Sequence, residues 1–308
     1  MNVQEVAAQY GEYLIEKRRY FHQHPEVSTK EYHTSKAIKE ALDEIGVSWR
    51  PCGLETGVLV TIQGAKPGKT ILLRGDMDAL TVQETTGAPY ASKNEGIMHA
   101  CGHDIHTSNL LTVAEILNRT KDQWKGKVKL VFQPAEENGG GGREMIKAGL
   151  MDEIPDACFA LHVENGIPGK IIVGSRYLTA YSDSYKITVH GKAAHSSTPE
   201  EGVDAVYIAA SIVTALHGII SRNLSPMDRA TLNVGMIHGG TAPNIIADEV
   251  TLGVMLRNLS KESREAMMKK IETISNGIAE SMGGSCDLAF RAGYAAVYND
   301  EKFSDFVA

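Results

Sequence analysis

Cysteine, tryptophan and the aromatic residues in general are scarce in this chain of 308 residues. The sequence holds four cysteines and two tryptophans, and aromatic residues make up 6% of it. Four cysteines, at positions 52, 101, 158 and 286, are too few and too widely spaced to form a disulfide framework in a chain of this size. We therefore expect a reducing, cytoplasmic location, which also suits a metal-binding thiol because an oxidised thiol does not bind metal.

The sequence also has no basic stripe. We expect no signal peptide in it and no apolar run of membrane-spanning length. The net charge is −7 and the lysines and arginines are scattered, which argues against a nucleic-acid partner. The first twenty residues form a charged amphipathic pattern rather than a signal peptide. With 43% hydrophobic residues, the chain can bury two hydrophobic cores. We expect neither a nucleic acid nor a membrane as partner.

Helical and strand patterns alternate in the first half, which predicts an α/β fold with a helix-covered mixed sheet. From Asp183 the order becomes strand, helix, strand, strand, helix, strand, which is typical of a ferredoxin-like (βαββαβ) domain. We expect a catalytic domain formed by residues 1–177 plus 294–308, and an inserted lid or dimerisation domain at 178–293. The short link from Ser175 to Ser182 is expected to act as a hinge. The expected helices are 3–21, 33–45, 104–119, 142–149, 203–222 and 261–281, and the expected strands are 57–63, 70–74, 128–132, 157–161, 183–190, 230–238, 248–256 and 284–290.

Three short clusters contain side chains that bind metals. They are Cys101-Gly102-His103-Asp104, then Glu136-Glu137, then His162 at the end of an apolar strand. Thiolate sulfur, imidazole nitrogen and carboxylate oxygen are zinc ligands, and a hydrolytic site needs a further carboxylate to accept a proton from water. The first cluster opens a predicted helix, whose dipole is expected to lower the pKa of the thiol.

The glutamate pair follows an apolar strand and precedes four consecutive glycines. Glu136 and Glu137 thus fall where open α/β sheets place their sites, although a solvated acidic turn is the alternative interpretation. The glycines at 139–142 allow the chain to wrap closely around a ligand. Cys158, on the following strand, is expected to point into the interior as a structural residue.

Two further acids lie two residues apart at the end of another apolar strand. Asp76 and Asp78 could bind a metal directly or orient a neighbouring ligand from behind it. The alternative is an Asx turn in which Asp76 caps the next segment. The residues alone do not decide between these interpretations.

The motifs as a set resemble the co-catalytic metallopeptidases and amidohydrolases of the aminoacylase and carboxypeptidase type. The branch that they resemble is that of hippurate hydrolase and the indole-acetyl-amino-acid hydrolases. The matching segments cover most of the chain: FHQHPE (21–26), RGDMDAL (74–80), MHACGHDIHTSNLL (98–111), FQPAEENGGGGREMI (132–146), GKAAHSSTPEEGVDAV (191–206) and GGTAPNIIADEV (239–250).

The resemblance implies an enzyme that hydrolyses the amide bond of an N-acyl amino acid, with a dipeptidase or carboxypeptidase as the alternative. It implies a binuclear site with Glu136 as general base and Asp78 orienting the site. Zinc or manganese are the expected metals, with nickel or cobalt able to substitute. The implied metal ligands are Cys101, His103, Glu137 and His162.

For the second half, the resemblance implies substrate contacts and an oligomer. His195 is expected to reach a neighbouring subunit's site and stabilise the oxyanion, Asn244 to contact substrate, and Arg257 to pair with its carboxylate. The lid is expected to form a homodimer or homotetramer.

Two features depart from the family's pattern. Val254 and Met255 replace the branch's usual Gly-Thr, so the pocket near Arg257 is expected to have a different shape. No histidine follows His238, whereas the family has a further ligand histidine in a C-terminal segment, so we expect that this segment is missing after Ala308. A folded, dimerising but inactive fragment is the alternative of a different class.

Overall fold

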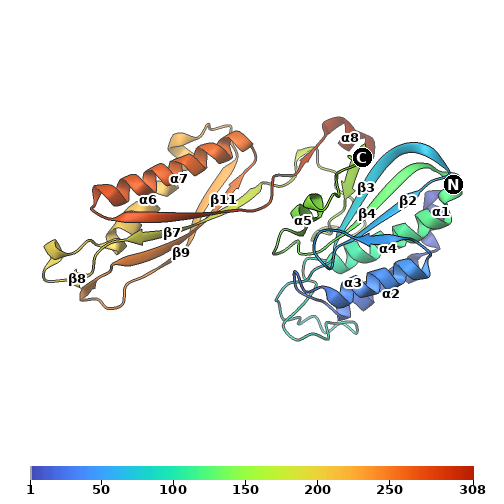
Figure 1. Ribbon diagram of the computed structural model, residues 1–308, viewed down its shortest axis with the longest axis horizontal. Coiled ribbons are helices and arrows are strands. Elements are labelled where there is room, and N and C mark those ends of the chain that lie inside the picture. Colours follow the sequence, from blue (N-terminus) through green and yellow to red (C-terminus); the bar gives the residue numbers. More distant parts are fainter. Residues whose placement is uncertain (1) are drawn as a thin grey trace. The chain divides into compact units, whose positions relative to one another are not determined.

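The computed structural model describes residues 2–308, which divide into two compact units (Figure 1). Unit 1 ends at Ile167 and unit 2 runs from Pro168 to Ala308. The expected division, in which residues 294–308 belong to the first domain, stays a prediction.

Unit 1 is a five-stranded mixed sheet with helices on both faces, which confirms the predicted α/β class. The strand order is β1-β2-β4-β3-β5, with β3 parallel to β4 and β5, and with β2 antiparallel to β1 and β4. The elements are α1 (Val3–Ala8), α2 (Gly11–Gln23), α3 (Tyr32–Glu44), β1 (Trp49–Pro51), β2 (Val58–Gln63), β3 (Lys66–Asp76), α4 (His103–Arg119), a 3-10 turn (Lys121–Gln123), β4 (Lys125–Gln133), α5 (Gly141–Lys147) and β5 (Ala157–Ala160).

Alternation along the strands determines which helices cover each face of this sheet. Val58 and Val60 of β2 pack in one cluster with Leu111 of α4, together with apolar residues of α2 and α3. Leu59, which points the other way, packs in a second cluster with Met145 of α5. Strands β3 and β4 therefore lie between two apolar layers, and β5 is held beside them by its pairing with β3.

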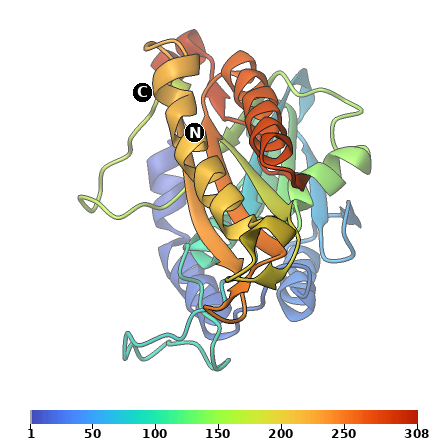
Figure 2. The same ribbon diagram turned by 90° about the vertical axis from the view of Figure 1, so that its left-hand side faces the viewer.

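Unit 2 contains a four-stranded antiparallel sheet with two long helices side by side on one face (Figure 2). The strand order is β12-β7-β11-β9, and Ile187 and Leu252 of the sheet pack against Ile212 and Ile271 of the helices. The elements are β6 (Arg176–Tyr177), β7 (Tyr181–His190), β8 (Ala194–His195), a 3-10 turn (Pro199–Glu201), α6 (Ala205–Asn223), β9 (Ala230–Gly239), β10 (Ile245–Ile246), β11 (Glu249–Asn258), α7 (Lys261–Ser281), β12 (Ser285–Ala292), β13 (Tyr298–Asn299) and α8 (Glu301–Val307).

Helix α6 is more apolar than the sequence analysis expected. An 18-residue window within its 19 residues has a mean hydropathy of 1.4, so by length and composition it could cross a membrane, and the expectation that no run reaches that length was wrong. Its buried face, which includes Ile208 and Leu216, is part of the core of unit 2. Core helices of water-soluble proteins pass the same test, so the composition alone is weak evidence for a membrane span.

Two smaller expectations were also wrong. The helix expected at 3–21 is divided into α1 and α2. The backbone N–H groups of Gln9 and Tyr10 bond to carbonyls only three residues back, and α2 then begins at Gly11, a poor helix former. Cys158 is exposed rather than interior. It lies on β5, an edge strand that contributes no described residue to either hydrophobic cluster of unit 1.

Candidate metal centre

The turn before α4 brings Cys101 and His103 to the same end of the sheet. Gly102 between them has φ +81°, a left-handed conformation that favours glycine. A Cβ atom at Gly102 would lie 2.2 Å from Cγ2 of Val163, so a side chain does not fit there. Two features thus require glycine at position 102: its left-handed backbone conformation, and the close approach of the segment that carries His162.

A thiol and two imidazoles meet at this turn. The Sγ atom of Cys101 lies 3.4 Å from Nε2 of His162, and the other ring nitrogen of His162 lies 2.6 Å from the carbonyl oxygen of Val163. One ligand atom each from Cys101, His103 and His162 lies within 4.8 Å of the others. His103 is fully buried, whereas His162 is exposed.

The glutamate pair approaches His103 from the turn after β4. Nε2 of His103 lies 3.8 Å from Oε1 of Glu137, and ligand atoms of His103, Glu136 and Glu137 lie within 4.8 Å of one another. Burial and then the charge of Glu137 raise the pKa of Glu136 above its ordinary value. Both carboxylates can reach the same centre, so the solvated acidic turn does not describe this segment.

Asp78 connects His103 to the glutamate turn. Its Oδ1 lies 3.3 Å from Nδ1 of His103, and its Oδ2 accepts hydrogen bonds from the Ser28 hydroxyl at 2.6 Å and from the Glu137 backbone N–H at 3.0 Å. Burial on its own raises the pKa of Asp78, but His103 and the Ser28 hydroxyl outweigh it, so the pKa lies below its ordinary value. Asp78 is thus a buried carboxylate beside His103.

Asp76 and His106 belong to the same cluster; the sequence analysis considered Asp76 as a metal-binding or orienting residue but did not name His106. Nδ1 of His106 lies 2.6 Å from Oδ1 of Asp76, and Nε2 of His106 accepts the backbone N–H of Val163 at 2.9 Å. This second bond fixes the tautomer, so Nδ1–H donates to Asp76. His106 thereby holds the residue that follows His162. It lies three residues after His103 on one helix face, which was the available sequence signal.

The buried polar atoms of this cluster fit a divalent cation. Nε2 of His103 and Oε1 of Glu137 have no hydrogen-bond partner among residues 2–308, although both are buried. A buried imidazole and carboxylate left in this way cost free energy unless another group satisfies them. Sulfur, nitrogen and oxygen donors converging on one point are the donor set of a zinc-type ion.

The thiol is not activated in the way that the helix position predicted. Burial and then the charge of Glu137 raise the pKa of Cys101 to about 12 in the metal-free protein. The expectation of a lowered pKa was wrong because burial of the thiol, together with the neighbouring carboxylates, raises the pKa. A cation at the centre would reverse this balance.

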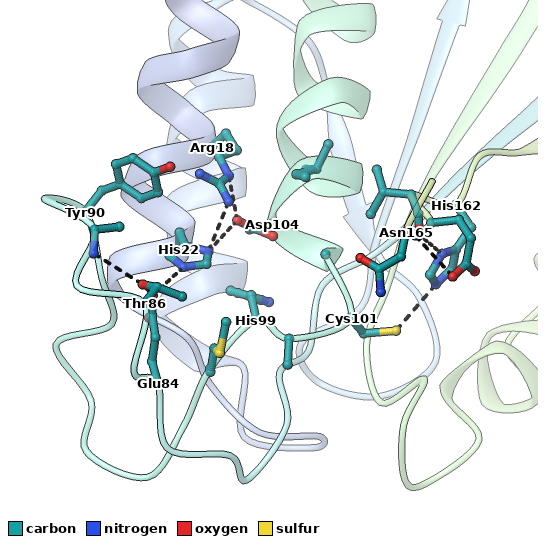
Figure 3. A pocket seen from close by; sticks show the side chains of 17 residues that line it. Arg18, His22, Glu84, Thr86, Tyr90, His99, Cys101, Asp104, His162 and Asn165 are labelled. Carbon is teal, nitrogen blue, oxygen red and sulfur yellow. Dashed lines mark hydrogen bonds and ion pairs between the residues drawn. The ribbon is translucent and has the colours of Figure 1, made fainter. Parts of the chain in front are cut away.

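A pocket of about 500 Å³ opens beside Cys101 and His162 (Figure 3). On its opposite wall, Asp104 accepts a hydrogen bond from Nδ1 of His22 at 2.8 Å and forms an ion pair with Nε of Arg18 at 2.9 Å. Figure 3 shows these three side chains pointing toward one another from α2 and α4. The motif FHQHPE thus contributes His22 to the support of the helix that carries His103.

The three predicted substrate residues of unit 2 lie at two different places. His195 on β8 pairs with Ile245, and the Ser196 N–H donates to the Asn244 carbonyl at 3.0 Å, so His195 and Asn244 are neighbours. Arg257 is exposed near the far end of β11, paired with Ser182. From Glu249, where β11 begins near β10, eight residues of strand lead to Arg257, roughly 26 Å.

Comparisons with known proteins agree with this chemistry. Residues 72–308 match the model of the peptidase family M20/M25/M40. The chain is similar to N-acetyl-L-cysteine deacetylase of Bacillus subtilis, with 40% identity over 295 residues that cover 96% of this chain and 71% of that protein. It is also similar to thermostable carboxypeptidase 1 of Saccharolobus solfataricus, with 38% identity over 96% of this chain and 76% of that protein.

The solved structures include a similar fold with two metals. The Bacillus subtilis YXEP protein, described as a dinuclear metal-binding peptidase of the M20 family, superposes with a TM-score of 0.82 and 32% identity. The match covers 98% of this chain and 78% of that chain. The convergent sulfur, nitrogen and oxygen atoms of unit 1 are therefore found in a fold that binds divalent metal.

Proposed function

Because the chain belongs to the peptidase family M20/M25/M40 and is a metal-dependent amide hydrolase, we propose that it hydrolyses N-acyl amino acids. The observation that carries this proposal is that His103 belongs both to the group with Cys101 and His162 and to the group with Glu136 and Glu137. Similarity to an N-acetyl-L-cysteine deacetylase supports an acylated amino acid as substrate. The motif resemblance supports the hippurate hydrolase branch.

We assign Cys101, His103, Glu137 and His162 as the residues that hold two divalent ions. Zinc or manganese are the proposed metals, and nickel or cobalt are the proposed substitutes. The bound metal would lower the pKa of a water molecule and polarise the amide carbonyl. The family's further ligand histidine stays a prediction, as does the cytoplasmic location.

Glu136 is the proposed general base. It takes a proton from the attacking water and gives that proton to the leaving nitrogen as the C–N bond breaks. Burial and the charge of Glu137 raise the pKa of Glu136, which is the direction that favours its accepting a proton. Asp78 keeps His103 oriented through the 3.3 Å contact to Nδ1.

We propose that unit 2 contains the inserted ferredoxin-like lid and that two copies of the chain complete one site. His195 and Asn244 lie on and beside the short β8–β10 pair that precedes β11, whereas Arg257 lies near the end of β11, roughly 26 Å of strand beyond Glu249, which supports contacts of these residues with different substrate sites. The edge strand β9 and helix α6 expose Met236, Ile237 and Tyr207, which supports association through this unit as a homodimer or homotetramer.

A carboxypeptidase or dipeptidase activity is the second candidate. Similarity to a thermostable carboxypeptidase at 38% identity favours it, since the same chemistry cleaves a peptide bond next to a free carboxylate. Both candidates use Arg257 for that carboxylate. The two candidates differ in the acyl side of the cleaved bond, which carries a free amine in a dipeptide and none in an N-acyl amino acid.

A substrate panel with one active-site variant tests the proposal. The metal-loaded protein is assayed on N-acetyl amino acids, N-benzoyl amino acids and unblocked dipeptides, with the released amino acid measured by chromatography. We expect faster turnover of the N-acyl compounds, and near-complete loss in Glu136→Gln with unchanged metal content. Glu144→Gln, which removes a charge on the surface of α5, is the control and retains turnover. Preference for dipeptides would favour the second candidate, and wild-type rates in Glu136→Gln would refute the base assignment.

A further inference from the structure

Two residues with a rare backbone conformation share one hydrogen-bond acceptor. Thr29 has φ 68° and Ala135 has φ 52°, a left-handed region that non-glycine residues seldom adopt, least of all a β-branched threonine. Both donate their backbone N–H to Oε1 of Glu31, each at 2.8 Å. Glu31 thus joins two strained positions that are more than one hundred residues apart in the sequence.

Burying the Glu31 carboxylate costs free energy because the group loses its hydration. Its side chain is fully buried, and its second oxygen accepts the hydroxyl of Thr56 at 2.9 Å. Burial raises the pKa of Glu31 above its ordinary value, as expected of a carboxylate removed from water. A buried carboxylate is retained only where its hydrogen bonds compensate for the lost hydration. The compensation here comes from the two backbone N–H groups and one hydroxyl.

The turn to which Glu31 is hydrogen-bonded contains the glutamate pair. Ala135, itself fully buried, directly precedes Glu136. The next backbone N–H groups are held in the same way, since Glu137 donates to Asp78 at 3.0 Å and Asn138 donates to the Ser28 hydroxyl at 3.1 Å. The segment from Ser28 to Glu31 therefore fixes the backbone on both sides of Glu136.

We propose that Glu31 is a positioning residue that holds the backbone at Ala135 in its left-handed conformation and so directs the Glu136 carboxylate toward the reacting water. This inference rests on the proposed function, because it takes Glu136 as the general base. Backbone strain concentrated at a functional turn and over-determined by its surroundings is consistent with this role. The sequence offered no signal for it, since Glu31 reads as an ordinary charged residue before a helix.

We predict that Glu31→Ala lowers kcat. Without Oε1, the Ala135 N–H loses its acceptor and the turn relaxes, and a misplacement of about 1 Å in a catalytic group costs on the order of 100-fold in rate. We expect kcat to fall roughly 10- to 100-fold while KM and metal stoichiometry stay within about twofold of wild type. Glu31→Gln retains a carbonyl oxygen for both N–H groups, so it restores most of kcat.

A measurement on the metal-free protein gives an independent readout. Hydrogen exchange of the Ala135 amide is expected to be slow in the wild type and in Glu31→Gln, and at least tenfold faster in Glu31→Ala. Glu115→Ala is the matched control, because Glu115 is a buried carboxylate of the same unit that pairs with Arg119 on α4 instead. It leaves both kcat and the Ala135 exchange rate unchanged.

The outcomes distinguish the positioning role of Glu31 from the general-base role of Glu136. If Glu136→Gln loses turnover but Glu31→Ala keeps wild-type kcat and amide protection, the positioning role is overturned. If Glu31→Gln is as impaired as Glu31→Ala, the role of Oε1 is overturned. If Glu136→Gln keeps wild-type turnover, the base assignment fails, and the exchange experiment then still decides whether Glu31 holds the turn. Should Glu31→Ala fail to fold, Glu31→Met, which fills the same space without an acceptor for the two N–H groups, replaces it in both measurements with the same expected losses and the same overturning results.

Discussion

Replacing Asp104 by alanine should destabilise unit 1 strongly. Asp104 is 1% exposed, accepts a hydrogen bond from His22 and forms an ion pair with Arg18, so its removal leaves two buried or half-buried cationic groups without their partner. Breaking a buried ion pair in this way costs about 3–5 kcal/mol of unfolding free energy. In a unit of this size, that lowers Tm by roughly 6–20 °C.

The pH dependence of this effect follows from the two pKa shifts. Burial alone raises the pKa of Asp104, but the hydrogen bond from His22 and nearby positive charges outweigh it, so the pKa lies below 3.8. The Asp104 contribution is therefore present above about pH 4 and lost as the pH falls through the lowered value. The hydrogen bond to Asp104 raises the pKa of His22 above 6.5, so the His22 contribution is complete below pH 6.5 and lost as the pH rises through the raised value. The stability difference between wild type and Asp104→Ala should be largest between about pH 4 and 6.5 and shrink above that range.

Urea unfolding followed by tryptophan fluorescence measures this difference directly. Both tryptophans, Trp49 and Trp124, lie in unit 1, so the signal reports that unit alone. Glu40→Ala is the control, because its exposed i,i+4 pair with Lys36 is worth about 0.3–0.5 kcal/mol. A loss below about 1 kcal/mol at pH 6 in Asp104→Ala, or a difference that grows above pH 7, would refute the reasoning.

Three further predictions concern the centre and the lid. Cys101 has a pKa of about 12 without metal, so loading metal at pH 7 should release a thiol proton, measured by pH-stat titration, and Cys101→Ser should release one proton fewer and bind metal more weakly. His106→Ala removes the acceptor of the Val163 N–H beside His162, so metal affinity measured by competition with a chelator should fall about 10- to 100-fold; unchanged affinity would contradict that role. His195→Ala should lower kcat about 10²–10³-fold in an oligomer confirmed by light scattering, as loss of an oxyanion donor does, and unchanged turnover would argue against its oxyanion role.

Periodic apolar patterns predicted the regular elements well. The helices expected at 33–45 and 261–281 form at Tyr32–Glu44 and Lys261–Ser281, because in each the buried positions recur at helical spacing. The four strands expected from 183 onward also form within two residues of their predicted starts. The short β8 and β10 were missed, because two residues carry no periodicity.

The candidate centre was partly accessible from the sequence. Cys101, His103 and Glu137 each stand at the end of a predicted element, where the sheet brings such side chains together. The residues that support them were not predicted, because Ser28, Glu31 and His106 act through backbone N–H groups of distant segments. The thiol pKa was predicted in the wrong direction for the same reason, since the burial and the carboxylates that raise it come from the packing of distant segments.

Metal stoichiometry tests the central claim most directly. The 308-residue chain is dialysed against zinc or manganese, freed of excess metal, and subjected to elemental analysis. The account predicts about two ions per chain, with a reduced content in Cys101→Ser and an unchanged content in Glu136→Gln. A wild-type chain that retains no ion while remaining folded would contradict the assignment of Cys101, His103, Glu137 and His162 as a metal centre, and would favour a folded, dimerising chain without catalysis.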